Sequence, residues 1–316
     1  MQSKTSFFIF TALSLLSFSL FAADKEYLGT AYVIKGKAEI QVPNLFTCNN
    51  GRSRPSPVGI HKHKDKSFIV PSKVNYEKKY FASDLYNKCS NVMPESLSEV
   101  NVSSVPIKEI DKDGDVITGY IFADNYFELF INGTLIAVDP IPFTPFNSNI
   151  VRFKVKKPYH IAIKVVDWEE NSGLGSEYNR GKQYHAGDGG LIASFSDGTI
   201  TNSDWSAQTF YTSPIYDLKC VKEHENKRLT PSCDTNGADE YMDTYSLHWD
   251  IPSNWQSDKS HLSWPKSVEF TEEEIVVHNK KSYMNFQEQF TGSGASFIWS
   301  SNLVLDNLVL FRYQVK

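Results

Sequence analysis

Residues 119–138, GYIFADNYFELFINGTLIAV, have the clearest secondary-structure pattern in the chain. Within this stretch, every second residue from Tyr126 to Ile131 is a large apolar one, which is the period of a β-strand with one buried face. Asn132-Gly133 comes next. This pair predicts a type I′ turn, because that turn needs two residues at positive φ. The stretch therefore predicts a β-hairpin.

Closing the hairpin on that turn predicts its register. Leu129 would face Ile136 and Phe127 would face Val138, which gives two apolar pairs on one face. Further strand patterns occupy 150–155, 159–168, 191–195 and 309–315. Helical patterns are scarce. Many short strands with regular turn signals predict an all-β sandwich or jelly roll.

Composition agrees with this fold class and narrows the partners. The 316 residues include 16 Tyr, 21 Phe and 6 Trp, and aromatic residues favour sheet. The formal net charge is −5, and no basic stripe is present. We therefore do not expect a nucleic-acid partner.

The N-terminus has the pattern of a signal peptide over residues 1–23. Lys4 supplies the positive region, Phe7–Phe21 the apolar region, and Ala22-Ala23 a small-residue cleavage site. The apolar run is too short for a membrane span, and no other run approaches the necessary length of about 20 residues. We expect a secreted or periplasmic protein with no membrane span.

Export gives the cysteines a role. Cys48, Cys89, Cys220 and Cys233 are even in number, and an oxidising compartment permits disulfides. Three connectivities are possible. We favour the local pairing of Cys48 with Cys89 and Cys220 with Cys233, because each bond then closes one segment outside the core.

The mature chain divides into two regions. Residues 24–105 form an N-terminal β-rich region that carries the first disulfide. Residues 106–316 hold the clearest strand patterns, and a disulfide-bearing insertion interrupts them at about 216–245.

Several motifs in the second region are shared with a known family. They are the Ala-Asp-Asn hairpin, Asp204-Trp205, Ser263–Lys266, Phe297–Trp299 and Val309–Arg312. Together they resemble the galactose-binding-domain-like jelly rolls, modules that accompany many secreted glycosidases and lectins. The resemblance covers most of residues 106–316 and implies a jelly-roll β-sandwich of the galactose-binding-like type. We expect the N-terminal β-rich region to be an extension of this sandwich. It also implies a ligand in loops at one end of the sandwich.

The candidate ligand site is the connection from Asp167 to Gly190, DWEENSGLGSEYNRGKQYHAGDGG. Connections of about 20 residues in compact domains are usually functional or disordered. This one concentrates aromatic, acidic and amide side chains, which suit a sugar ring and its hydroxyls. The candidate residues are Trp168, Glu169, Glu170, Glu177, Asn179, Arg180, Tyr184, His185 and Asp188.

The expected roles follow from side-chain chemistry. Trp168 or Tyr184 would stack on the sugar, while Asn179 and Arg180 would hydrogen-bond to its hydroxyls. The alternative is a surface loop bonded to itself, with Arg180 paired to a glutamate of the same loop.

Two patterns suggest metals. Asp111, Asp113 and Asp115 place carboxylates at alternate positions, a pattern compatible with calcium, although an ordinary acidic turn explains it better. His61 and His63 would form a transition-metal pair, for example for copper, but we favour a solvated loop.

The sequence leaves three functions open. We favour an exported, non-catalytic sandwich that binds a glycan or another cell-surface ligand. The first alternative is a polysaccharide-active hydrolase with its acids between Glu169 and Asp188. The second is a structural protein or one that binds calcium or copper. Asp124 is a candidate catalytic acid, but we expect it to hold the sheet end by bonding nearby backbone.

Overall fold

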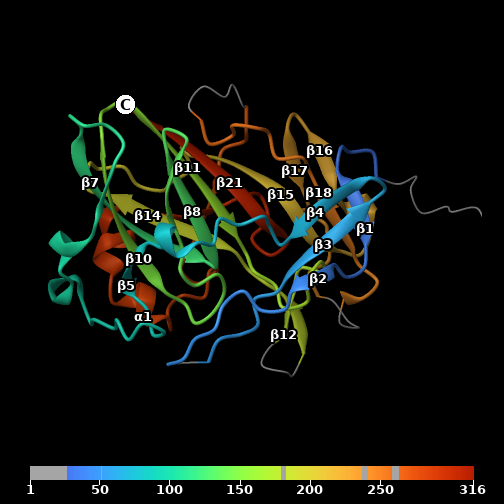
Figure 1. The fold of residues 1–316 in the computed structure, drawn as a ribbon. Helices are drawn as coiled ribbons and strands as arrows, with labels where there is room; N and C mark the ends of the chain where they lie inside the picture. Colours follow the sequence, from blue (N-terminus) through green and yellow to red (C-terminus); the bar gives the residue numbers. More distant parts are fainter. Residues whose placement is uncertain (1–26, 51, 179–182, 237–240, 258–262) are drawn as a thin grey trace, which may run out of the picture.

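The computed structural model describes residues 27–50, 52–178, 183–236, 241–257 and 263–316. The predicted signal peptide, residues 1–23, lies outside them. The described residues form an all-β structure dominated by two seven-stranded sheets (Figure 1). Three small sheets, one short α-helix and several 3₁₀ helices of three residues each accompany them in the described residues.

The strands of the first large sheet are antiparallel. Its order is β1 (Tyr32–Lys35), β18 (Tyr245–His248), β15 (Ser206–Ile215), β21 (Asp306–Val315), β11 (Tyr159–Val166), β8 (Tyr126–Ile131) and β9 (Thr134–Val138). The second has the order β19 (Val268–Phe270), β20 (Phe297–Trp299), β14 (Gly190–Phe195), β7 (Asp115–Asp124), β10 (Ser148–Val155) and β5 (Ser83–Tyr86). A short strand, β6 (Ile107–Glu109), lies parallel to β10.

The small elements lie outside these two sheets. One small sheet contains β2 (Glu39–Val42), β3 (Val58–His63) and β4 (Lys66–Val70). The two others are the pairs β12 (Ser176–Tyr178) with β13 (Tyr184–Ala186), and β16 (Lys222–His224) with β17 (Lys227–Leu229). The helix is α1 (Lys281–Met284).

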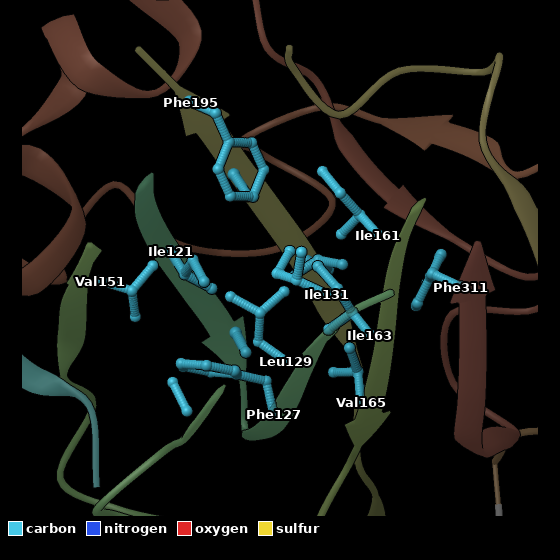
Figure 2. Packing of buried hydrophobic residues seen from close by; sticks show 14 of the residues in the cluster. Ile121, Phe127, Leu129, Ile131, Val151, Ile161, Ile163, Val165, Phe195 and Phe311 are labelled. Atoms are coloured by element: carbon cyan, nitrogen blue, oxygen red, sulfur yellow. The ribbon is translucent and has the colours of Figure 1, made fainter. Parts of the chain in front are cut away.

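The central core lies between the two large sheets. Figure 2 shows Ile121 and Val151, from the second sheet, facing Leu129 and Ile163, from the first. All four are buried. Burying an aliphatic side chain of this size contributes about 1.5–3 kcal/mol, so this layer contributes substantially to the stability of the structure.

The outer faces of both sheets are covered as well. Phe122 on the second sheet packs against Tyr283, which lies in α1, and against Phe290, which lies shortly after it in the chain. On the first sheet, Tyr126 packs against Tyr76 of the N-terminal region. The predicted single buried face of β8 is therefore wrong: all six of its residues are buried, and Glu128 pairs at 2.7 Å with Lys164.

The hairpin of β8 and β9 closes on the predicted turn. Asn132 and Gly133 have φ of 50° and 79°, as a type I′ turn requires. The predicted pairs beyond the turn are wrong, because a bulge shifts the register by one residue between Leu129 and Phe130. Leu129 faces Ala137 instead of Ile136. Likewise Val138 faces Glu128, not Phe127.

The N-terminal region contributes strands to both large sheets. β1 pairs with β18 at the edge of one sheet, and β5 pairs with β10 at the edge of the other. Each large sheet therefore contains strands from both of the regions into which the sequence was divided at residue 105. Both predicted disulfides are confirmed, with Cα–Cα distances of 5.1 Å for Cys48–Cys89 and 5.0 Å for Cys220–Cys233. In the described part of the chain, no helix has the length and apolar character of a membrane span.

Candidate functional site

A cleft of about 1000 Å³ lies at the end of the second sheet where β5 stops and β10 begins. Five chain segments line it: residues 52–55, 86 and 88, 144–146, 170 and 178, and 279–282. Two of the lining residues, Glu170 and Tyr178, come from the connection that the sequence identified. The other segments are distant in sequence and meet here through the sheet topology.

Arg54 joins the first wall of the cleft to the connection. Its guanidinium donates to Glu170 at 2.6 Å and to Glu177 at 2.5 Å, and it lies 4.6 Å from the centre of the Phe143 ring. Burial alone would lower the pKa of Arg54, but the two carboxylates outweigh burial and raise it. Arg54 therefore stays charged and fixes β12 against residues 52–55.

The first disulfide holds two cleft segments together. Cys48 lies four residues before Arg52, and Cys89 directly follows Lys88. The Asn50 side chain donates to the Cys89 carbonyl at 3.2 Å, next to the bond. The disulfide therefore holds Arg52 and Lys88 on two cross-linked loops at the rim of the cleft.

The crossover before β10 supplies another wall. Asp139, fully buried, accepts a hydrogen bond at 2.8 Å from Asn147, which holds the ends of this crossover together. Phe146 projects from it and stacks on Phe122, with ring centroids 6.2 Å apart. The ammonium of Lys280 lies 3.9 Å from the centre of the Phe146 ring, a cation–π contact.

Aromatic rings also come from β12 and β5. Tyr178 and Tyr184 face each other across the β12–β13 pair and stack with centroids 4.4 Å apart. Tyr178 is 37% exposed, so part of its ring is free to contact a ligand. Tyr86 is buried, yet it lines the cleft, and its hydroxyl makes no hydrogen bond to any described residue.

Behind the cleft wall lies a group of four carboxylates, which we call the carboxylate cluster: Asp124, Asp167, Glu177 and Asp188. Asp124 ends β7 opposite Gly190, so Asp188 lies close by. Gly187 leaves no room for a side chain, since a Cβ there would lie 2.6 Å from an Asp167 oxygen. Asp167, Asp124 and Glu177 are all buried.

Burial and mutual repulsion disfavour the charged forms of these groups. Burial raises the pKa of Asp124 and Asp167 well above the ordinary value, and neighbouring carboxylates add to the effect. Burial and the charge of Glu177 raise the pKa of Asp188 to about 6. One Asp167 oxygen is buried with no hydrogen-bond partner among the described residues. The cluster therefore retains protons more readily than ordinary carboxyl groups.

Asp124 does not hold the sheet end in the predicted way. Its carboxylate accepts a hydrogen bond from the side chain of Asn125, and the structure gives it no backbone donor among the described residues. Asn125 does the backbone bonding instead, since its side-chain oxygen accepts from the Trp168 N–H at 2.6 Å.

Two of the predicted ligand residues lie in the core. Trp168 is fully buried, packs edge-on against Tyr126 and donates its indole N–H to the Pro57 carbonyl at 3.1 Å. Its ring faces are covered by protein, so it offers no stacking surface. Glu169 is also buried and accepts from the Tyr211 hydroxyl at 2.9 Å.

The other predicted residues fall into three groups. Glu170, Glu177, Tyr184 and Asp188 lie in or directly behind the cleft wall. His185 is exposed, with Nδ1 2.8 Å from the Ala186 carbonyl oxygen. Asn179 and Arg180 lie outside the described residues, so their expected contacts stay predictions.

The predicted metal patterns do not form ligand groups. Asp111 accepts from the Lys156 backbone N–H at 2.9 Å, and Asp113 pairs with the Lys156 ammonium at 3.4 Å. Asp115, the third member, is exposed in β7. In the described ranges no three His, Cys, Asp or Glu side chains are arranged to hold a metal ion.

The expectation of a solvated loop around His61 and His63 is wrong for His61. His61 is buried on β3, where its Nδ1 lies 2.9 Å from Nε2 of His248 and its Nε2 3.0 Å from the Gly36 carbonyl oxygen. Burial lowers the pKa of His61 to about 4, so this pair is a neutral part of the core.

Sequence reasoning missed the basic residues of the cleft. They are Arg52, Arg54, Lys88, Lys280 and Lys281. Three of them flank Cys48 and Cys89, so the predicted disulfide was the available signal for their proximity. Comparison with protein-family models, curated proteins and solved structures gives no match.

Proposed function

We propose that this protein is an exported, non-catalytic β-sandwich that binds carbohydrate in the cleft at the end of the second sheet. The observation that carries the proposal is the composition of the cleft wall. It combines the partly exposed ring of Tyr178 and the ring of Phe146 with side chains that donate and accept hydrogen bonds.

This combination suits a sugar. An aromatic face covers the C–H surface of a pyranose ring, and a few placed polar groups bind its hydroxyls. Ser53, Thr144 and Asn279 supply such groups around the cleft. We assign to Tyr178 the stacking role that was expected of Trp168 or Tyr184, and its partner Tyr184 holds the ring in place.

The wider setting supports the same proposal. Two layered sheets with loops gathered at one end suit a jelly roll of the galactose-binding-like type, in which ligands bind at such loops. Two disulfides suit an oxidising compartment outside the cytoplasm. We therefore extend the proposal to export by the signal peptide at residues 1–23 and to a glycan as the partner.

A glycan array with the mature protein, residues 24–316, tests the proposal. We expect binding to at least one glycan class, a loss of at least tenfold in Tyr178→Ala, and retention in Tyr178→Phe, which keeps the ring. Binding that is equally strong in Tyr178→Ala would contradict the assignment of the binding site to the cleft. Absence of binding to every glycan would contradict carbohydrate recognition itself.

The carboxylate cluster favours one alternative, a polysaccharide hydrolase. Asp188 is partly exposed, and its raised pKa suits a group that donates or accepts a proton near neutral pH. Release of reducing ends from a bound polysaccharide would support catalysis. Loss of that release in Asp188→Asn with unchanged binding would assign it to the cluster.

A further inference from the structure

We infer that the cleft selects acidic carbohydrate, a glycan bearing carboxylate or sulfate groups. The inference rests on the proposed function and adds the charge of the ligand to it. Five basic side chains and one carboxylate, that of Glu170, line the cleft. The whole chain has a formal net charge of −5, so this cleft gathers positive charge on an acidic protein.

Two of the five basic groups are neutralised by the protein. Arg54 is paired with Glu170 and its neighbour Glu177, as described above. Lys281 pairs at 3.1 Å with Glu95, and both side chains are exposed. Arg54 and Lys281 therefore connect segments of the cleft wall, and their paired charges contribute little to binding a ligand.

The remaining cations face the cleft without a compensating ion pair. Arg52 and Lys88 are exposed, and neither forms a salt bridge with a residue that the structure describes. Because the Cys48–Cys89 bond cross-links their loops, both charges stay at the same rim. Lys280 lies further in, above the Phe146 ring, and makes no salt bridge in the described residues. Its charge acts on Asp124 and Asp188 and opposes the rise of their pKa, so the carboxylate cluster offsets part of it.

The Tyr86 hydroxyl offers one more hydrogen-bond donor to a ligand. Most of the Tyr86 side chain is packed in the protein, but its hydroxyl reaches the cleft, and no described residue bonds to it. The hydroxyl is not one of the buried polar atoms that lack a partner, so it is open to solvent and to a ligand oxygen. Hydrogen bonds to a charged acceptor are roughly twice as strong as neutral ones, so an anionic oxygen suits this donor best.

Three polymers distinguish the possible ligands: polygalacturonate for carboxylate, dextran sulfate for sulfate, and dextran as the neutral polymer. Affinity of the mature protein is measured for each at low and high salt. The test variant is Arg52→Ala with Lys88→Ala. Its matched control is Lys37→Ala with Lys112→Ala, which removes two exposed charges away from the cleft and changes the net charge equally.

We expect tighter binding of one or both acidic polymers than of dextran, with the stronger polymer showing which acidic group is preferred. The cleft variant should bind the preferred polymer at least tenfold more weakly, and the control less than twofold. High salt should weaken binding, since exposed charges are screened.

Other outcomes separate the two proposals. Equal binding of dextran and both acidic polymers, unaffected by the cleft variant, overturns the acidic selectivity and leaves carbohydrate binding standing. Acidic-polymer binding that weakens equally in the two variants overturns it as well, because general charge then explains the binding. Failure to bind any of the three, together with no binding on the glycan array, rejects both.

Discussion

Glu169 illustrates how single side chains shape the connection that ends at the cleft. Its carboxylate accepts from the backbone N–H groups of Leu174 and Gly175 and from the Tyr211 hydroxyl. The carboxylate thereby closes the turn before β12 and anchors it to β15. Burial nevertheless raises the pKa of Glu169 to about 7, so folding favours its protonated form.

This pKa predicts a pH dependence of stability. A folded pKa of about 7 against 4.5 for the free side chain means that the folded state binds more protons between these values. The stabilising contribution is present below pH 4.5 and lost as the pH rises through 7. The free energy of unfolding of the native protein should therefore fall between pH 5 and pH 8. In Glu169→Gln this fall should be smaller by about 1–3 kcal/mol.

Urea unfolding at both pH values measures this difference. Glu273→Gln, at an exposed glutamate, is the control and should keep the native pH dependence. An identical pH dependence in Glu169→Gln and the native protein would contradict the assigned role of Glu169.

Residue chemistry alone pointed to several residues that line or back the cleft, and it misassigned Trp168. The acids of the Asp167–Gly190 connection could be recognised because they are dense in sequence. Trp168 could not be distinguished from a stacking residue, because its burial depends on Pro57 and Tyr126, which lie far away along the chain. Long-range packing of this kind leaves no local sequence pattern.

At the scale of elements, local turn chemistry proved more predictable than register. Asn132-Gly133 dictates its own turn, so the hairpin could be predicted from a few residues. The bulge beside Leu129 and the burial of both faces of β8 could not, because each depends on neighbouring strands and on the N-terminal layer.

The two disulfides offer a matched comparison at this scale. Removing the first bond by Cys48→Ser with Cys89→Ser opens a loop with a separation of 41 residues, and removing the second opens one of 13. The chain-entropy relation gives losses of about 4 and about 3 kcal/mol. Only the first variant should weaken ligand binding, because only that bond joins cleft segments.

Unfolding and affinity are measured on both variants at a temperature where both remain folded. Comparable weakening of binding in the two variants would show that stability, not the geometry of residues 52–55 and 86–88, controls affinity.

For the molecule as a whole, the N-terminal region is part of the sandwich. It supplies edge strands to both sheets and covers the outer face of the first. We predict that residues 106–316 alone do not unfold cooperatively, because Tyr126 would lose its contact with Tyr76 and Trp168 its hydrogen bond to Pro57. The chain from residue 24 onward should show one cooperative thermal transition. A sharp transition in the shorter chain would contradict this integration.

Ligand binding at the cleft at the end of the second sheet can be mapped along the chain. The test is hydrogen–deuterium exchange of the mature protein with and without the acidic polymer that binds more tightly, polygalacturonate or dextran sulfate. We predict slower exchange at residues 52–55, 86–88, 144–146 and 279–282, and no change at the groove lined by Lys227 and Leu229. Binding accompanied by protection at that groove, and none at the cleft segments, would contradict the account.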